Sequence, residues 1–575
     1  MTSLSALSLA RAPRWPRLLL RVDPRLRAPL SAQQVVVRLS LYLLLAANGP
    51  LWRALLHAGG DVRQTLQAML AMALLLGCAT LAVLAFTAWT RGMRWLWWLV
   101  LLIAALAQYY MLSYRVVIDP GMAANVLQTD AHEVADLLGW RMLAAVAAVM
   151  LLPTWWLARV RIAPMPWPRQ LARNLALLAL ALLLAGVSVA ALSRTLAPLM
   201  RNQPQLRYLM NPVASLYSVT VALQRQWFSR SKTLVPMTAG AALGTSYARQ
   251  GAPALLVLVL GETARADHFG VNGYARETTP ELARRGLLSW RHVLSCGTST
   301  QASLPCMFSP LGKARFDARS DEYENLLDVV QAAGLAVLWI DNQSGCKGVC
   351  ERVASAHASD GLPAAQRARL CPGGECPDSV LLEQLDARIA ALPADKRQRG
   401  VLLVLHQMGS HGPAYYKRSQ PEHKRFLPEC RTEVLANCGQ EALVNGYDNT
   451  IVATDAFLGQ AVDWLQARQA RYDGGLLYMS DHGESLGEYG LFLHGMPYAI
   501  APRAQKHVPM LAWLSPQLAH RLGLNEACLR TRLDTPLTHD HLYSSVLGLL
   551  DLESPGYQRP LDALAPCRNK SKNRV

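Results

Sequence analysis

The first third of the chain contains long apolar runs separated by short polar segments. Each run is about as long as a helix that crosses a bilayer, which takes roughly 20 residues. The runs predict five membrane-spanning helices, at 36–57, 65–88, 94–114, 141–159 and 173–196. After about residue 240, charged residues and Gly/Pro turns separate shorter apolar segments. We therefore expect a multi-pass helical membrane domain followed by a soluble domain.

The second part of the chain alternates β-rich apolar runs with helical patterns. Strands are predicted at 254–262, 336–342, 400–409, 475–483 and 508–514. The runs are apolar without interruption, which is typical of parallel strands buried on both faces. The pattern predicts an α/β domain with a mostly parallel sheet and helices on both faces. Ligands of such sheets bind at the carboxyl ends of the strands.

These patterns divide the chain into five segments. We expect a basic arm at 1–35, a five-helix transmembrane domain at 36–199, a linker at 200–250, a soluble domain at 251–567 and a basic tail at 568–575. Within the linker, the stretch 215–230 reads as an amphipathic helix on the membrane surface. The arm is not interpreted as a cleavable signal peptide, because it is long and its apolar stretch is short.

The charge of the chain sets its orientation in the membrane. A formal net charge of +17 permits nucleic-acid binding, but the arginines flank the apolar runs, as in 90–94 and 158–173. Further arginines precede the first span: Arg11, Arg14, Arg17, Arg21, Arg25 and Arg27. The positive-inside rule places these segments in the cytoplasm. Five crossings then place everything after about residue 197 on the outer side, and we expect no nucleic-acid partner.

The cysteines indicate the redox compartment. Of 11 cysteines, only Cys78 lies in the apolar third. Eight form close pairs: Cys296/Cys306, Cys346/Cys350, Cys371/Cys376 and Cys430/Cys438. Zinc clusters are the competing interpretation of two of these spacings. Four successive local pairs with few nearby histidines favour disulfides, and hence an oxidising compartment. The sequence does not assign a partner to Cys528 or Cys567.

Acidic and imidazole side chains follow the predicted strands. They are Glu262 after the first strand, His406 and His411 after the third, and Asp481, His482 and Glu484 after the fourth, with His494 twelve residues beyond His482. Carboxylate and imidazole groups meeting at one sheet edge could hold one cation. A mixed oxygen and nitrogen ligand set with an open position suits a catalytic Zn²⁺, and Mn²⁺ is the rival metal.

The stretch "SCGTSTQASLPCMFS" brackets three hydroxyl residues between two cysteines. The hydroxyls belong to Thr298, Ser299 and Thr300. A hydroxyl is a poor nucleophile unless a base or a metal activates it. A clamped loop beside a metal site therefore indicates an immobilised nucleophile. The alternative for Thr300 is an ordinary N-cap of the helix that follows.

Five motifs together resemble a known family. "GETARADHFGVNGY", "SCGTSTQASLPCMFS", "DNQSGCKGVC", "HQMGSHGPAYY" and "SDHGESLGEYGLFLHG" are similar to segments of the phosphoethanolamine–lipid A transferases. Those are inner-membrane enzymes that confer polymyxin resistance. Their catalytic domain resembles the alkaline phosphatase/sulfatase superfamily. The resemblance covers nearly the whole chain. The loop lacks the C/S-x-P-x-R nucleophile motif of sulfatases, which counts against sulfate-ester chemistry.

The resemblance implies roles for individual residues. Thr300 would be the nucleophile, and the zinc ligands would be Glu262, Thr300, Asp481 and His482. A second group would line the substrate phosphate or a second, weaker metal position: Lys347, His411, Glu484 and His494. Of these, His411 or His494 would shuttle a proton.

The resemblance also implies the reaction and its location. Phosphoethanolamine would pass from phosphatidylethanolamine to Thr300 and then to a lipid A phosphate, which lowers the negative charge of the outer membrane. The protein would be a monomer in the bacterial inner membrane, among its lipids, with its catalytic domain in the periplasm. The alternatives are an inner-core sugar as acceptor, a glycerophosphate transferase of the lipoteichoic acid synthase type, and a non-catalytic lipid-binding module.

The loop between the third and fourth predicted spans carries a further candidate. Asn125, Thr129 and Glu133 are spaced i, i+4 and i+8, so they share one face of a helix. A solvated surface helix is the simple interpretation. However, the loop is predicted on the same side as the soluble domain, and the similar family has a substrate-binding element there. Glu133 would suit an ethanolamine ammonium, so we expect this loop to contribute to the lipid site.

Overall fold

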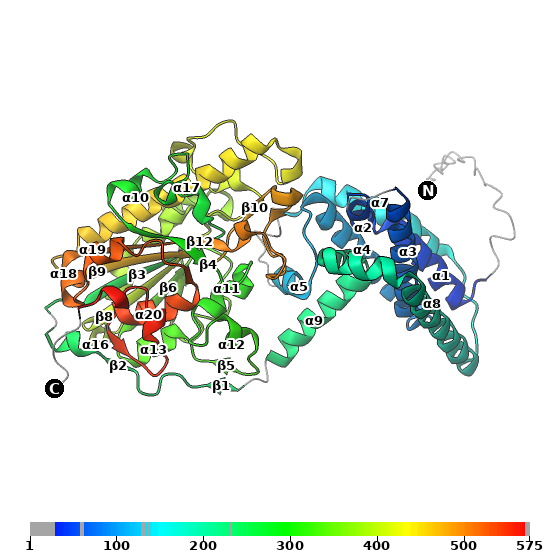
Figure 1. Cartoon of the computed structure of the whole chain (residues 1–575), viewed down its shortest axis with the longest axis horizontal. Coiled ribbons are helices and arrows are strands. Elements are labelled where there is room, and N and C mark those ends of the chain that lie inside the picture. The colour runs from blue at the N-terminus through cyan, green and yellow to red at the C-terminus, as the bar shows by residue number, and fades with distance from the viewer. Residues whose placement is uncertain are drawn as a thin grey trace, which may run out of the picture.

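The chain forms a helical bundle joined to an α/β domain (Figure 1). The computed structural model describes residues 29–57, 62–127, 134, 137–229, 233–249 and 251–569. Most of the predicted basic arm and basic tail lies outside these residues. The two parts confirm the prediction of a multi-pass helical domain followed by an α/β domain with a mostly parallel sheet.

The bundle contains four helices that are long and apolar enough to cross a membrane, counted over the described residues. They are α3 (Val62–Ala85), α4 (Arg94–Ser113), α7 (Trp140–Arg159) and the first part of α8 (Trp167–Asn202). Two shorter helices, α1 (Ala32–Ala46) and α2 (Gly49–His57), meet at 46° and make a fifth span if they are counted together. Each of the five predicted spans therefore has a helical counterpart.

The bend within the first predicted span has a local cause. Ala47 and Asn48 separate α1 from α2, and Pro50 occupies the first turn of α2, where a missing N–H costs little. The fully buried amide of Asn48 donates to Leu43 O at 2.9 Å and to Asn211 O at 2.7 Å. These bonds connect the break between α1 and α2 to the segment before α9.

Two helices lie between the bundle and the α/β domain (Figure 1). These are α5 (Pro120–Leu127) and α9 (Val213–Ser229), which pack against each other. The hydroxyl of Ser218 on α9 donates to Ile118 O at 2.8 Å. Helix α9 coincides with the helix predicted at 215–230, and its location on a membrane surface stays a prediction.

An eight-stranded sheet forms the centre of the α/β domain, in the order β13-β4-β12-β9-β3-β8-β6-β7. Its middle consists of strands predicted from the sequence: β9 (Asp473–Ser480), β3 (Ala254–Gly261), β8 (Gly400–His406) and β6 (Ala336–Asp341). All neighbours within this group are parallel. The sheet is therefore mostly parallel, as expected.

The fifth predicted strand departs from the expectation. Strand β12 (His507–Leu514) is antiparallel to both of its neighbours, β9 and β4 (Leu288–Leu294). A strand buried on both faces is apolar throughout whichever way it runs, so hydrophobicity does not fix its direction. The strand pattern also missed β4, β7 (Ala354–His357) and β13 (Leu537–Thr538), which lie toward the sheet edges.

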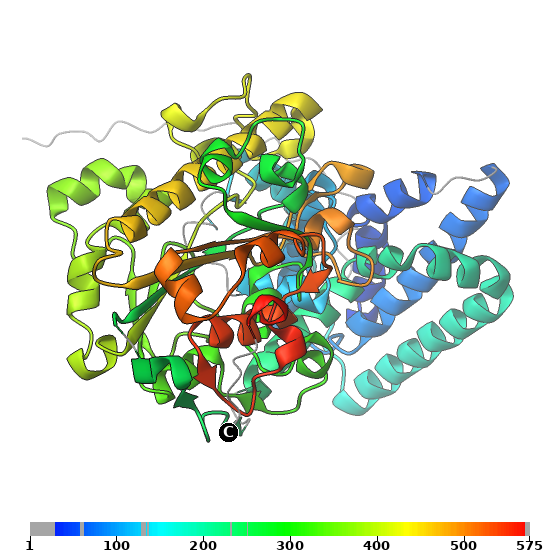
Figure 2. The same cartoon turned by 60° about the vertical axis from the view of Figure 1, so that its left-hand side comes forward.

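Both faces of the sheet are covered, as the uninterrupted apolar runs predicted. Alternate residues of β3 enter two different clusters: Leu256 and Leu258 pack on one side, and Leu255 and Val257 on the other. Helices α13 (Leu326–Ala332) and α20 (Asp540–Leu549) cover the first face, and α17 (Gln440–Gln466) covers the second (Figure 2). This burial holds the carboxyl ends of the strands rigidly.

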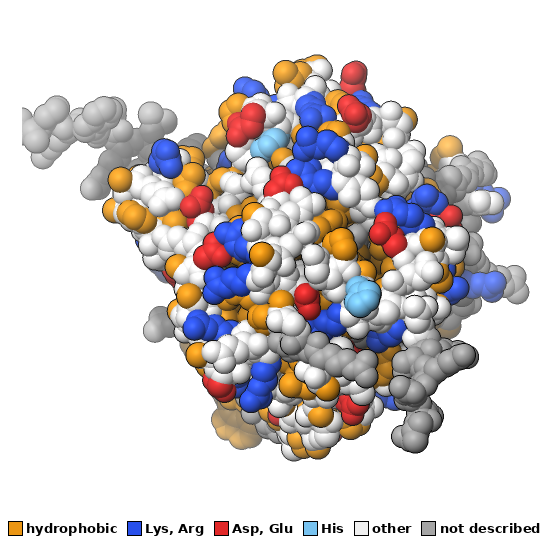
Figure 3. Space-filling view, turned by 90° about the vertical axis from the view of Figure 1, so that its left-hand side faces the viewer, with side chains coloured by type: hydrophobic (Ala, Val, Ile, Leu, Met, Phe, Trp, Pro, Cys, Tyr) orange, Lys and Arg blue, Asp and Glu red, His pale blue; other side chains and the backbone are white. Residues whose placement is uncertain are grey.

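The surface farthest from the bundle carries charges of both signs. Lysines, arginines, aspartates and glutamates are interspersed there (Figure 3). This mixture is typical of the surface of a soluble domain. A surface that binds nucleic acid instead carries a continuous patch of positive charge.

Candidate active site

The sheet brings three ionisable side chains to one edge. Glu262 directly follows β3, and Asp481 and His482 directly follow the neighbouring parallel strand β9, whose Ser480 pairs with Gly261. All three side chains are fully buried. One ligand atom from each lies within 4.8 Å of the others. The prediction that these residues meet follows from the register of two adjacent parallel strands.

The imidazole of His482 lies between the two carboxylates. Its Nε2 is 3.2 Å from Glu262 Oε1 and 3.3 Å from Asp481 Oδ2. Its Nδ1 lies 2.9 Å from Gly483 O, so that carbonyl accepts the Nδ1 proton and leaves Nε2 facing the acids. Burial and the charge of Glu262 raise the pKa of Asp481 to about 7. Burial opposes the charge of His482, but Asp481 and Glu262 raise its pKa to about 10.

This group of residues fits a divalent cation. Asp481 Oδ2 is buried without a hydrogen-bond partner among the described residues, which is costly unless a cation or proton satisfies it. Two adjacent buried carboxylates likewise need a positive partner. Two carboxylates, one imidazole nitrogen and a hydroxyl are a donor set that suits Zn²⁺. Glu262, Asp481 and His482 would therefore hold the metal.

Thr300 directs its hydroxyl at the same place. Its Oγ1 donates to Glu262 Oε2 at 3.0 Å and lies 3.5 Å from His482 Nε2. The residue opens α11 (Thr300–Met307), and the N-cap position belongs to Ser299, whose backbone is extended. The alternative that Thr300 is only an N-cap is therefore wrong. The predicted nucleophile and the predicted metal ligands form one cluster.

The loop that carries Thr300 is fixed covalently and by hydrogen bonds. A disulfide joins Cys296 to Cys306 across it. The Thr298 hydroxyl donates to Met496 O at 2.6 Å, and the backbone N–H of Cys296 donates to His539 Nδ1 at 3.0 Å. The loop is thus held from three directions, which keeps the hydroxyl of Thr300 in place.

The other close cysteine pairs also form disulfides. They are Cys346–Cys350, Cys371–Cys376 and Cys430–Cys438, and a fifth joins Cys528 to Cys567. The last pair is 39 residues apart, which explains why local spacing did not reveal it. Cys78 is the free cysteine of the described residues.

Two further histidines line the cluster. The ring of His494 lies 4.3 Å from the ring of His482 and 5.3 Å from that of His411, centroid to centroid. Burial and the charge of His482 lower the pKa of His494, so its imidazole is neutral and can accept a proton. Glu484 is fully buried with Oε1 3.3 Å from His494 Nδ1. This places Glu484 behind His494, where it orients the ring.

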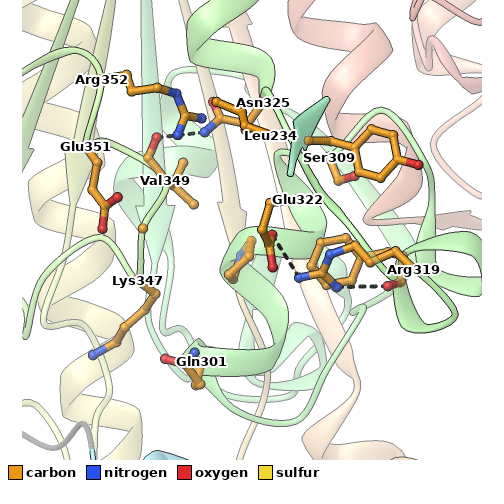
Figure 4. A pocket seen from close by; sticks show the side chains of 14 residues that line it. Leu234, Gln301, Ser309, Arg319, Glu322, Asn325, Lys347, Val349, Glu351 and Arg352 are labelled. Carbon is orange, nitrogen blue, oxygen red and sulfur yellow. Dashed lines mark hydrogen bonds and ion pairs between the residues drawn. The ribbon is translucent and has the colours of Figure 1, made fainter. Parts of the chain in front are cut away.

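A cavity of about 500 Å³ has Gln301 and Pro305 of α11 in its lining (Figure 4). Lys347 and Gln301 lie at one of its ends, and Asn325 and Arg352 at the other. The ammonium of Lys347 donates to Ser344 O at 3.0 Å and to Ser344 Oγ at 2.8 Å. Gln301 directly follows Thr300 on α11. Lys347 therefore lines the same cavity as the residue that follows Thr300.

One contributor was missed by the sequence reasoning. The side-chain amide of Gln343 donates to Glu262 Oε2 at 3.2 Å. It lies two residues beyond β6 and accompanies Asp341 at the carboxyl edge of the sheet, so the strand-end rule that identified Glu262 also applied here. His406, noted at the end of β8, instead faces Asp341 Oδ2 at 3.5 Å within the core.

The membrane domain reaches the cluster through α5. This helix contacts α11, and the Met122 side chain lies so close to Gly495 that a Cβ there would be 2.5 Å from its Cε. Asn125 lies on α5 and is partly buried. Thr129 and Glu133 lie outside the described residues. The common helix face predicted for Asn125, Thr129 and Glu133 therefore stays a prediction.

The fold and the cluster define a class of protein. Residues 254–552 match the family model described as Sulfatase, and residues 76–227 match the one described as Phosphoethanolamine transferase EptA/EptB. A sulfatase-type domain on a membrane bundle is thus the architecture of this molecule.

The relatives identify the family. The chain is similar to phosphoethanolamine transferase EptA of Salmonella typhimurium, with 38% identity over 82% of this chain and 85% of that protein. It is also similar to phosphatidylethanolamine transferase Mcr-1 of Escherichia coli, with 38% identity over 78% and 82% of the two chains. The integral membrane lipooligosaccharide phosphoethanolamine transferase A of Neisseria meningitidis superimposes with a TM-score of 0.86 at 33% identity, over 94% of this chain and all of that one. The chain belongs to the phosphoethanolamine transferase family and is an enzyme that transfers this group.

Proposed function

We propose that the enzyme transfers phosphoethanolamine from phosphatidylethanolamine to a phosphate of lipid A through a covalent intermediate on Thr300. The hydroxyl of Thr300, aimed into a cluster of two buried carboxylates and one imidazole, carries the proposal. The names of the relatives support both substrates, since one is a phosphatidylethanolamine transferase and another a Kdo(2)-lipid A phosphoethanolamine transferase.

The first half-reaction breaks the donor. Thr300 Oγ1 attacks the phosphorus of phosphatidylethanolamine, the bond from phosphorus to the diacylglycerol oxygen breaks, and diacylglycerol leaves with a proton. Glu262 Oε2 already accepts the proton of the attacking hydroxyl. His494 or His411, close to His482, would carry the proton of the attacking hydroxyl to the leaving oxygen. A Zn²⁺ held by Glu262, Asp481 and His482 would lower the pKa of the hydroxyl and offset negative charge on the phosphoryl oxygens.

The second half-reaction loads the acceptor. An oxygen of a lipid A phosphate attacks the phosphorus on Thr300, the bond from phosphorus to Thr300 Oγ1 breaks, and the threonine hydroxyl regains its proton. Lys347 and the N-terminus of α11 would attract the anionic oxygens during both steps. Product lipid A would carry less negative charge, and we expect this to lower its attraction for polymyxin.

The location of the enzyme follows from these substrates. Both are membrane lipids, so the active site belongs next to the outer face of the inner membrane, with the α/β domain in the periplasm. The disulfides support an oxidising compartment. We further propose that the enzyme acts as a monomer and has no nucleic-acid partner. An inner-core sugar is the second candidate acceptor.

Mass spectrometry tests the covalent step. After incubation with phosphatidylethanolamine, the peptide that spans Cys296–Cys306 is expected to gain one phosphoethanolamine group, located on Thr300. Thr300→Ala is expected to abolish both the adduct and the transfer, whereas Thr298→Ser, its neighbour in the same loop, keeps the adduct. An adduct on Ser299 or Thr298 would overturn the assignment of the nucleophile. Mass spectrometry of lipid A from cells with and without the protein identifies the acceptor.

A further inference from the structure

A second cavity lies where the membrane helices meet the α/β domain. It has a volume of about 410 Å³, and we call it the boundary cavity. Its walls come from α2, α4, the segment after α8 and the segment 489–496 of the α/β domain. Figure 1 shows α2 and α4 within the bundle and α5 between the bundle and the α/β domain. The boundary cavity therefore belongs to neither part of the chain alone.

The boundary cavity combines an apolar wall with positive charge. Apolar side chains such as Met111, Leu112 and Leu209 form much of its lining. Its charged groups are the guanidinium groups of Arg53 and Arg115, and none of the described lining residues is acidic. Neither guanidinium has a hydrogen-bond or ion-pair partner among the described residues. Two unpaired cations above an apolar wall are complementary to an anionic lipid head group.

Backbone strain marks the same place. Seven described residues other than glycine have positive φ angles, and two of them, Arg115 (φ 55°) and Tyr489 (φ 55°), line the boundary cavity. Three others, Thr263, Lys347 and Leu493, flank the active site. Such conformations cost energy and cluster at functional sites. Tyr489 is also 90% exposed, so an aromatic ring stands open at the rim.

The boundary cavity is connected to the nucleophile through one short segment. Met496 lines the cavity, and its carbonyl accepts the hydroxyl proton of Thr298, two residues before Thr300. His494 precedes it by two residues and lies in the active site. The short segment 494–496 therefore contacts both the boundary cavity and the active site.

Charge decides which lipid phosphate belongs there. The phosphate of phosphatidylethanolamine carries an ammonium within the same head group, which two arginines without an acidic neighbour would repel. A phosphate monoester has two negative charges and no cation, and arginine binds it with paired N–H donors. Lipid A carries more than one phosphate, so one can bind while another reacts.

We propose that the boundary cavity binds a non-reacting phosphate monoester of the acceptor glycolipid, with Arg53 and Arg115 as its ligands. The proposal rests on the proposed function and adds to it a second anchor for the acceptor. The apolar wall receives the first methylene groups of an acyl chain. Binding at two phosphates sets which end of the acceptor faces Thr300.

The experiment compares two acceptors on the full-length enzyme in vesicles. One acceptor is a bisphosphorylated lipid A and the other lacks the phosphate that does not react. Wild type is expected to show a KM about tenfold or more higher for the second, because a charge-assisted hydrogen bond contributes about that factor. Arg53→Gln and Arg115→Gln are expected to remove the preference by raising the KM of the bisphosphorylated acceptor. Arg→Lys at either position retains part of it.

Two controls separate this proposal from its alternatives. Arg63→Gln removes an exposed charge at the start of α3, on the same side of the bundle, and is expected to change nothing. Diacylglycerol release without acceptor, which reports the donor half-reaction, is expected to stay at the wild-type rate in the Arg53 and Arg115 variants. Slowed release would assign the boundary cavity to the donor, and an unchanged acceptor preference would also overturn the proposal. A wild-type enzyme that forms no adduct on Thr300 would instead refute the proposed function.

Discussion

Removing the disulfide that clamps the nucleophile loop gives a quantitative test of the active site. Cys296 and Cys306 are 10 residues apart, and a cross-link that closes such a loop stabilises the fold by about 2.7 kcal/mol through the entropy of the unfolded chain. The Cys430–Cys438 disulfide closes a loop of similar size, with a separation of 8, and gives about 2.5 kcal/mol. Replacing either pair by alanines should therefore lower the free energy of unfolding by nearly the same amount.

The two double variants should differ in catalysis. Only the Cys296/Cys306 loop contains Thr300, whose Oγ1 is held 3.0 Å from Glu262 Oε2. A displacement of about 1 Å costs on the order of a hundredfold in rate. Denaturant unfolding measures stability, and adduct formation per folded molecule measures catalysis. We expect equal destabilisation of the two variants, a large loss of rate for Cys296→Ala/Cys306→Ala, and near wild-type rate for Cys430→Ala/Cys438→Ala. Equal rates in the two variants would refute the reasoning that the clamp positions the nucleophile.

Three further predictions concern the metal, pH and the membrane domain. Chelation should lower the unfolding temperature and abolish the adduct, because two buried carboxylates lose their shared cation; Zn²⁺ should restore both, and equal recovery with Mn²⁺ would contradict the zinc assignment. Burial lowers the pKa of His539 to about 3, and its neutral ring accepts from the Cys296 N–H. The contribution of the neutral His539 ring to the free energy of unfolding is therefore complete above the pKa of histidine in the unfolded chain, about 6.5. It is lost as the pH falls toward 3, by up to about 1.4 kcal/mol per pH unit. Denaturant unfolding between about pH 5 and 7 should show this slope in wild type and a flatter one in His539→Gln, and identical slopes would count against it. A full-length protein with Asn125, Thr129 and Glu133 changed to alanine should fold and bind zinc but transfer slowly, as should the isolated domain from about residue 240; wild-type transfer by the triple variant would show that the loop is only a connector.

Most of the catalytic cluster could be predicted because the chemistry follows strand ends. Glu262 and Asp481 come directly after uninterrupted apolar runs, and adjacent parallel strands bring such positions together. The same reasoning failed for the direction of β12, because burial on both faces produces the same apolar pattern in either direction. The hydrophobic pattern did not predict the bend between α1 and α2, since both helices are apolar. Asn48 and Pro50, which lie at the bend, were the residues that could have indicated it.

The boundary cavity was beyond sequence reasoning for a different reason. Arg53 lies in the middle of α2, Arg115 lies two residues after the end of α4, and Tyr489 comes from a loop more than three hundred positions later in the chain. Each residue alone reads as an ordinary arginine near a membrane or an exposed loop tyrosine. Only the packing of the bundle against the α/β domain brings them to one cavity, and that packing depends on contacts between distant segments rather than on any local period.

The segment 491–501 connects the membrane helices to the active site. Met496 and Ala501 are buried in one hydrophobic cluster with Leu51 of α2 and Met111 of α4, while His494 in the same segment faces His482. We therefore expect a tilt or shift of these helices to move His494, one of the two histidines proposed to transfer the proton. Bilayer thickness and lateral pressure act on helix tilt. The rate of this enzyme should accordingly depend on the membrane that surrounds it, even when the concentrations of both lipid substrates are held constant.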